Sequence, residues 1–243
     1  MRGLILALGF LTRLPLPAVR DFQPAELARA LVWFPAAGLV VGAAVALVAA
    51  LGALLDPWLG ALAGVVMWAW ITSGLHLDGL ADTADALGAA HRDPARFLAV
   101  LADPHVGSFG VIALVLQLLA KLVLLHWLLL LELPWLVLVL IPAWARWSAA
   151  GWALLLPALK PGLGERVSRN GKRAGWIIGG LALAATSAVV PPAFAALIPT
   201  LLWGVWMRIK LGGHTGDILG AGIEWCESAA LLLAGVFFTV IFL

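Results

Sequence analysis

The sequence is poor in charge: of its 243 residues only 12% are Asp, Glu, Lys or Arg, whereas 63% are apolar. Soluble domains have about 25% charged and about 45–50% apolar residues, because polar side chains must cover their surface. This composition excludes a water-soluble globular protein. The chain is predicted to be an integral membrane protein, and its 13 Trp and 9 Phe suit the boundary with a lipid bilayer.

Other scarcities exclude further classes of protein. Cys226 is the single cysteine, so neither an intramolecular disulfide nor a cysteine-based metal site can form. The net charge is only +2, and no basic run suits nucleic acid. The apolar start of the chain meets Arg13 and two prolines without a small-residue cleavage motif. It is therefore predicted to lie at the membrane interface and not to be a signal peptide.

Long apolar runs dominate what is present. A spanning helix needs about 20 residues, so the length allows about seven spans and no separate soluble domain. We predict an all-α, polytopic helical bundle, a single membrane-embedded domain over residues 1–243 whose apolar faces could support a homo-oligomer. The expected spans are Leu31–Leu55, Trp58–Ser73, Phe109–Leu131, Trp135–Leu156, Trp176–Val190, Ala193–Met207 and Ile218–Leu243.

The basic residues indicate how these spans are oriented. Thirteen of the fifteen Lys and Arg residues lie in alternate connections, whereas short connections such as Asp56-Pro57 and Pro191-Pro192 carry none. Because connections rich in Lys and Arg stay in the cytoplasm, the four segments that carry these thirteen residues are predicted to be cytoplasmic. The C-terminus is then predicted to be external. The basic residues of the four segments are Arg2, Arg13, Arg20, Arg29, Arg92, Arg96, Lys160, Arg166, Arg169, Lys172, Arg173, Arg208 and Lys210.

Three aspartates, Asp78, Asp82 and Asp85, follow the second expected span. At about 100° per residue they fall within roughly 60° of one another on a helix, where like charges repel. A solvated acidic face is one interpretation. Since the cluster abuts the membrane in a chain with few charges, we favour a site for Mg²⁺, which takes carboxylate oxygens and leaves positions for water and substrate phosphate.

A second polar segment, Gly212–Asp217, lies on the same predicted side of the membrane. Its glycines allow the backbone to approach a phosphate closely, and Thr215 and Asp217 offer oxygens to a metal or its waters. A plain loop is the alternative, but beside the aspartates this segment is predicted to form the second half of one site. Glu224 and Glu227 could face that site or mark a helix entrance.

Lys121 and Arg146 interrupt apolar runs. An ionisable residue at that depth must face the bundle interior or water, which makes it a candidate functional residue. We predict that Arg146 binds a diphosphate through two parallel hydrogen bonds and that Lys121 acts as a point charge. The alternative is an internal ion pair with one of the aspartates or with Glu132.

Further candidates lie near the aspartates. Asp103 could contribute a metal or substrate contact. His76 and His105 are the nearest candidates for a general base, because histidine titrates near neutrality, although each could instead be structural. Together, clustered carboxylates, a glycine loop and buried cations predict a Mg²⁺-dependent transfer that involves a diphosphate.

Several runs carry a resemblance to a known family. His76–Asp85 (HLDGLADTAD) resembles the signature of the cobalamin synthase, or adenosylcobinamide-GDP ribazoletransferase, family. Its other familial runs are Phe10–Pro15 (FLTRLP), Trp33–Pro35 (WFP), Asp103–Gly110 (DPHVGSFG) and Gly213–Gly220 (GHTGDILG), so the resemblance spans nearly the whole chain. The departures are Ala86, where the family pattern has glycine, and His214, where tyrosine is common; neither removes a carboxylate.

The resemblance implies a bacterial inner-membrane transferase that acts at the cytoplasmic side. It would join adenosylcobinamide-GDP to α-ribazole, or to its 5′-phosphate, and release GMP. With residue chemistry added, we predict Asp78, Asp82, Asp85 and Asp217 as Mg²⁺ ligands, Asp82, His76, Arg146 and Lys121 as catalytic residues, and Asp103, Gly213, His214, Thr215 and Gly216 as substrate contacts.

Two other functions also use carboxylates in a membrane protein. A CDP-alcohol phosphotransferase also has a D-G motif and Mg²⁺, but it requires an arginine where this chain has Asp82 after Ala81, and a later G-x-x-x-D-x-x-x-D that is missing here. A secondary transporter could use buried carboxylates, but transporters place them near the midplane on broken helices. Release of GMP would separate these hypotheses.

Overall fold

The computed structural model describes residues 1–21, 23–90, 93–161, 165–166 and 171–242. Within these ranges all regular elements are helices, apart from one isolated pairing of Ala158 with His214. The predicted all-α membrane bundle is therefore confirmed. The helices are α1 (Arg2–Leu11), α2 (Pro24–Ala30), η1 (Leu31–Trp33), α3 (Phe34–Ala53), α4 (Pro57–Ile71), α5 (Leu75–Ala90), α6 (Pro94–Val100), α7 (Ser108–Leu130), α8 (Trp135–Leu155), α10 (Arg173–Ser187), η2 (Pro191–Ala196), α11 (Leu197–Trp206), η3 (Met207–Leu211) and α12 (Gly216–Phe242).

Five helical stretches of the described chain are long and apolar enough to cross a membrane: Glu26–Ala53, Ser108–Leu130, Trp135–Leu155, Pro191–Leu211 and Gly216–Ile241. The second span expected from the sequence, Trp58–Ser73, is shorter than these five stretches in the structure. Helix α4 has 15 residues and reaches spanning length only together with α5, across a bend of 85°. Ser73 and Gly74 make that bend with positive φ angles of 54° and 68°. The expected fifth span, α10, also has 15 residues.

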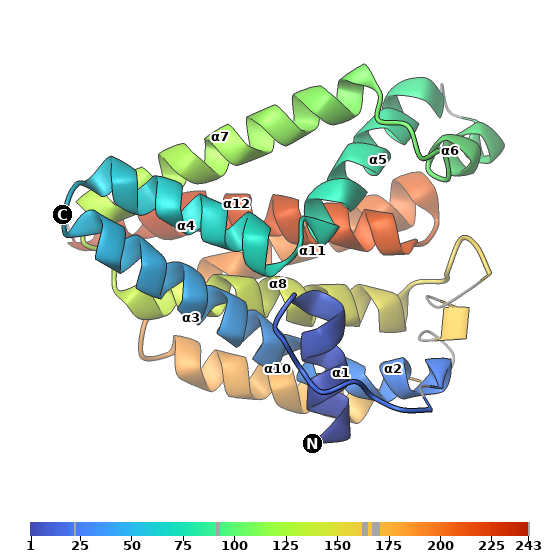
Figure 1. Cartoon of the computed structure of the whole chain (residues 1–243), viewed down its shortest axis with the longest axis horizontal. Coiled ribbons are helices and arrows are strands. Elements are labelled where there is room, and N and C mark those ends of the chain that lie inside the picture. Colours follow the sequence, from blue (N-terminus) through green and yellow to red (C-terminus); the bar gives the residue numbers. More distant parts are fainter. Residues whose placement is uncertain (22, 91–92, 162–164, 167–170, 243) are drawn as a thin grey trace.

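The connections divide between the two ends of the bundle. In Figure 1, α3, α7 and α10 end, and the helices that follow them begin, at the end of the bundle that holds the C-terminus. Helices α5 and α8 end towards the opposite end, where α12 begins. This arrangement agrees with the alternation expected from the basic residues. Arg92 and Arg169, which contribute to that expectation, lie outside the described residues.

Helix α8 occupies the centre of the bundle, between α3 and α10 on one side and α12 on the other (Figure 1). Val137, Leu140 and Trp144 of this helix are buried in a core that also includes Val41 of α3 and Leu231 of α12. A helix that is apolar on all sides is expected at such a central position. Its buried position is what brings Arg146 into the interior.

Polar side chains start several helices. Asp56 accepts hydrogen bonds from the backbone N–H groups of Trp58 and Leu59, and thereby caps α4. Asp93 caps α6 in the same way through Ala95 and Arg96. Gly107, the N-cap residue of α7, has no side chain. The start of α7 is instead capped by the carboxylate of Asp85 from α5.

Candidate active site

A cavity of about 310 Å³ lies where the predicted halves of the site meet. One wall is apolar and comes from the N-terminal helices and from Leu75, the first residue of α5. The other is polar and comes from α5, the Ala158–Pro161 segment and the start of α12. The polar lining residues are His76, Asp78, Lys160, His214, Thr215 and Asp217, and Phe10, Leu11, Leu27, Leu31, Phe34 and Leu75 supply most of the apolar wall.

The segment between η3 and α12 is fixed by backbone pairing. The backbone N–H of His214 donates to the Pro157 carbonyl at 2.9 Å, and the N–H of Leu159 donates to the His214 carbonyl at 2.9 Å. Gly213 packs against the Pro157 carbonyl, where a Cβ would collide with it. Thus His214, Thr215 and Gly216 line the cavity as predicted contacts should, whereas Gly213 supports the turn behind them.

Thr215 directly precedes α12, and Asp217 lies in the first turn of that helix. The Thr215 hydroxyl donates to Oδ2 of Asp217 at 3.2 Å and accepts from the backbone N–H of Ile218 at 3.3 Å. Nζ of Lys160 lies 3.3 Å from the same carboxylate oxygen. This half-exposed ion pair places one positive charge at an otherwise acidic rim.

Asp78, Asp82 and Asp217 come together across the contact between α5 and α12. The helices approach closely at Gly79, where a Cβ would lie 2.7 Å from the Asp217 carbonyl oxygen. Asp78 is exposed and lines the cavity, and Asp82 is half-buried one turn further along α5. Partial burial, and then the charges of Asp78, Asp217 and Asp85, oppose ionisation of Asp82, whereas Lys160 favours it.

The third predicted aspartate has a different environment. Asp85 is buried, and its oxygens accept hydrogen bonds from the backbone N–H groups of Gly107 at 2.7 Å and Gly110 at 2.8 Å. Its carboxylate therefore caps the start of α7, whose N-terminal N–H groups favour an anion. The structure gives Asp85 a structural role that the helical spacing did not predict.

The carboxylates are not arranged as a complete protein cage for a metal. In the described parts of the chain, no group of three or more His, Cys, Asp or Glu side chains is placed to hold a metal ion. Mg²⁺ is commonly bound by one or two carboxylates together with waters and substrate phosphates. Asp78 and Asp217 at the cavity, with Asp82 beside them, have the chemistry for that mode of binding, and the metal assignment stays a prediction.

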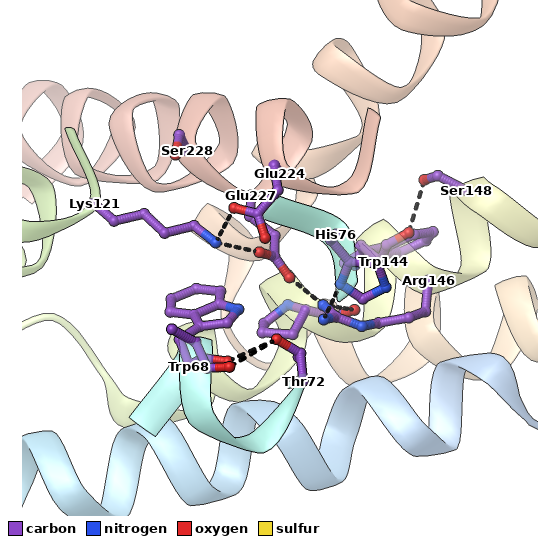
Figure 2. A network of polar contacts seen from close by, with 12 residues as sticks. Trp68, Thr72, His76, Lys121, Trp144, Arg146, Ser148, Glu224, Glu227 and Ser228 are labelled. Carbon is purple, nitrogen blue, oxygen red and sulfur yellow. Dashed lines mark hydrogen bonds and ion pairs between the residues drawn. The ribbon is translucent and has the colours of Figure 1, made fainter. Parts of the chain in front are cut away.

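The two cations within apolar runs belong to a buried network that joins four helices (Figure 2). Nζ of Lys121 lies 2.7 Å from Oε2 of Glu224 and 2.6 Å from Oε2 of Glu227, and it sits 4.2 Å from the centroid of the Trp68 ring. Arg146 forms an ion pair with the other oxygen of Glu227. All four charged side chains are buried, so they neutralise one another inside the bundle.

This network favours the internal ion-pair alternative over the predicted phosphate contacts. The partners are Glu224 and Glu227, not an aspartate or Glu132, and neither Lys121 nor Arg146 lines the cavity. It also resolves the open question about the glutamates, which face the interior. Arg146 reaches the site only indirectly, through Nη2 at 3.4 Å from Nδ1 of His76.

Asp103 and His105 are not among the residues that line the cavity. Both are exposed, and Nδ1 of His105 is 2.7 Å from Oδ1 of Asp103. Hydrogen bonds from the backbone and side chain of His105 lower the pKa of Asp103. A substrate contact by Asp103 stays a prediction. Burial, by contrast, lowers the pKa of His214, and the Ala153 backbone opposes that change to a smaller extent.

Two parts of the site were missed from the sequence. From the sequence, Lys160 is only a cytoplasmic charge, Phe10 belongs to the interfacial N-terminal segment, and Phe34 belongs to the first expected span. The rings of these two phenylalanines stack with centroids 6.2 Å apart. The familial run that begins at Phe10 was the available signal, but contact between α1 and the start of α12 depends on the fold.

Comparison with known proteins gives one family. The family model described as cobalamin-5-phosphate synthase matches residues 3–235. Three bacterial relatives are each called adenosylcobinamide-GDP ribazoletransferase. The protein of Thiobacillus denitrificans is 84% identical over 236 residues, which cover 97% of this chain and 96% of its own length. The proteins of Laribacter hongkongensis and Novosphingobium aromaticivorans are 56% and 51% identical, with 97% of each chain covered. No solved structure matches the chain.

Proposed function

Because the chain belongs to the cobalamin-5-phosphate synthase family, we propose that it is a membrane-bound adenosylcobinamide-GDP ribazoletransferase. It joins adenosylcobinamide-GDP to α-ribazole, or to α-ribazole 5′-phosphate. The products are adenosylcobalamin, or its 5′-phosphate, and GMP. The observation that carries the proposal is the cavity at which the familial runs His76–Asp85 and Gly213–Gly220 meet.

The two walls of the cavity suit the two kinds of group that this reaction brings together. The apolar wall with Phe10 and Phe34 can cover the flat aromatic base of α-ribazole. The polar wall offers carboxylates, a hydroxyl and Lys160 to the ribose and the diphosphate. A volume of about 310 Å³ is near the lower end for ligand sites, about 300–1,000 Å³, so the large corrin ring stays outside it.

The bond changes balance without a further reactant. A ribose hydroxyl oxygen of α-ribazole attacks the phosphorus atom attached to cobinamide, and a new P–O bond forms. The P–O bond to the bridging oxygen breaks, GMP leaves with that oxygen, and the hydroxyl proton is released. Lys160 and the Thr215 hydroxyl lie at the cavity rim, where they can bind phosphate oxygens and orient the diphosphate for this attack.

Magnesium is proposed as the cofactor, held by Asp78, Asp82 and Asp217. When bound, Mg²⁺ supplies positive charge that neutralises the phosphate groups. The fit rests on the donor set, because carboxylate oxygens at the cavity are the ligands this ion prefers. Asp85 is left out of the proposed ligands, since backbone N–H groups engage both of its oxygens.

We further propose that the protein lies in the bacterial inner membrane with this cavity open to the cytoplasm. Lys160, which belongs to one of the basic connections, lines the cavity, and basic connections remain cytoplasmic.

The test uses the purified protein in liposomes with adenosylcobinamide-GDP, α-ribazole and Mg²⁺. GMP and the corrinoid product are followed together, with and without EDTA. Equal amounts of both products, lost on chelation and restored by added Mg²⁺, are expected. GMP without a corrinoid product would indicate hydrolysis. CMP from a CDP-alcohol, or no product at all from folded protein, would overturn the proposal.

A further inference from the structure

His76 is buried with one ring nitrogen engaged and the other free. Its Nδ1 lies 3.4 Å from Nη2 of Arg146, and 2% of the residue is exposed. Its Nε2 is buried without a hydrogen-bond partner in the described chain. The residue also lines the cavity. A buried polar atom left without a partner is costly, and at a cavity wall it is a candidate to bind a polar group of a ligand.

The contact with Arg146 determines which nitrogen of His76 carries the proton. A guanidinium group has donors and no acceptor, so Nδ1 must be the acceptor. The proton of the neutral ring is then on Nε2. The guanidinium group of Arg146 is held in this position, because it also donates to the Pro142 carbonyl at 3.2 Å and pairs with Glu227.

The network behind Arg146 fixes this arrangement from three helices. Glu227 of α12 is held by Lys121 of α7, and Arg146 itself comes from α8 (Figure 2). A guanidinium that pairs with a carboxylate has little freedom to turn, since its planar donors must stay aligned. The buried charges thereby fix the orientation of a side chain at the edge of the cavity.

We infer that His76 donates a hydrogen bond from Nε2 to a phosphoryl oxygen of the substrate diphosphate, and that Arg146 is the positioning residue that maintains this tautomer. The inference rests on the proposed function. Phosphoryl oxygens are acceptors only, so they match a buried donor that lacks a partner. A donor held in place stabilises the negative charge that develops on these oxygens during transfer. His76 is therefore not the general base.

Three replacements of His76 separate a donor from a base. Glutamine places an amide N–H group near the position of Nε2, asparagine reaches only the position of Nδ1, and leucine has no donor. We expect His76→Gln to keep kcat within about tenfold of the wild-type value, and His76→Asn and His76→Leu to lower it about 10²–10³-fold, the usual loss for one such donor. Glutamine cannot act as a base. The inference would be overturned if His76→Gln lost as much kcat as His76→Leu while it still eluted as a single species and unfolded at the wild-type temperature.

A double-mutant cycle tests whether Arg146 acts through His76. Arg146→Lys keeps a positive charge beside Glu227 but lacks the second arm that reaches Nδ1. We expect it to lower kcat at least tenfold in the wild-type background and less than threefold in the His76→Gln background. Equal losses in both backgrounds would show that Arg146 acts by another route and would overturn its positioning role.

The tautomer can be observed without turnover. ¹⁵N NMR of histidine-labelled protein in liposomes, with the His76 signals identified by their loss in His76→Gln, should show a protonated Nε2 and an unprotonated Nδ1. Arg146→Lys should mix the two tautomers. A protonated Nδ1 in the wild-type protein would overturn the inference even if the proposed activity is confirmed. Failure of the proposed function would instead appear as wild-type protein with the expected tautomer and no GMP release.

Discussion

Oδ1 of Asp85 accepts a hydrogen bond from the backbone N–H of Gly110 at 2.8 Å, although 25 residues separate the two in the sequence. The contact ties α5, which carries the acidic face, to the first turn of α7. It requires glycine at position 110, because a Cβ there would meet the carboxylate. The same carboxylate that looks like a metal ligand in the sequence therefore connects two helices in the structure.

Asp85→Asn should destabilise the protein. The amide keeps one acceptor but turns an NH₂ group toward a backbone N–H, which leaves a buried donor without a partner. We expect a loss of about 1–3 kcal/mol in the free energy of unfolding, measured by thermal unfolding in detergent. An unchanged unfolding temperature, with a higher Mg²⁺ requirement, would instead favour a metal ligand.

Asp82→Asn should abolish turnover while membrane insertion and the unfolding temperature stay unchanged. Asp82 is half-buried beside Asp78 and Asp217, so its carboxylate is available to the proposed cofactor. Coupled release of GMP and corrinoid product measures the loss. Asp21→Asn is the matched control, since Asp21 is an exposed residue with a φ of 54°, which asparagine also tolerates. Full activity in Asp82→Asn would exclude the carboxylate from the reaction.

Lys121→Met should unfold or strongly destabilise the bundle. It removes one of two buried cations and leaves Glu224 and Glu227 with Arg146 alone. Loss of one partner from a buried ion pair costs about 3–5 kcal/mol. The double variant with Glu224→Gln restores the charge balance and should recover much of the stability. If both variants unfold at the same temperature, charge balance is not what the network contributes.

Gly79→Ala should impair the site by separating α5 from α12. Its Cβ would lie 2.7 Å from the Asp217 carbonyl oxygen, so the helices must move apart, and Asp78 moves away from Asp217. We expect activity to fall at least tenfold. Gly9→Ala, in α1 with no atom within 4 Å of the added Cβ, is the control and should stay active. Equal activity of the two variants would show that the spacing of α5 and α12 does not matter for turnover.

Much of the architecture could be predicted from the sequence because it depends on local composition. All seven expected spans are helices, and successive helices are joined at alternate ends of the bundle. The second expected span was harder to predict. Apolar length alone does not reveal the turn at Ser73 and Gly74, which bends α5 away from α4 by 85°.

The candidate site was only partly predictable for a similar reason. The helical spacing of Asp78, Asp82 and Asp85 follows from the sequence, but spacing cannot say which oxygens face a cavity and which cap another helix. Lys121 and Arg146 were recognised as needing partners, because charge within an apolar run is costly. Their partners on α12 depend on helix packing across the bundle.

The sequence by itself determined the class of protein, the family and the residue types available for phosphate chemistry, since composition and motifs are local properties. Only the tertiary structure decided how those residues are used. It placed Asp78 and Asp217 at one cavity, made the Asp85 carboxylate a cap of α7, and brought Arg146 into contact with His76. Each of these outcomes depends on atoms that lie far apart along the chain and meet only when the helices pack.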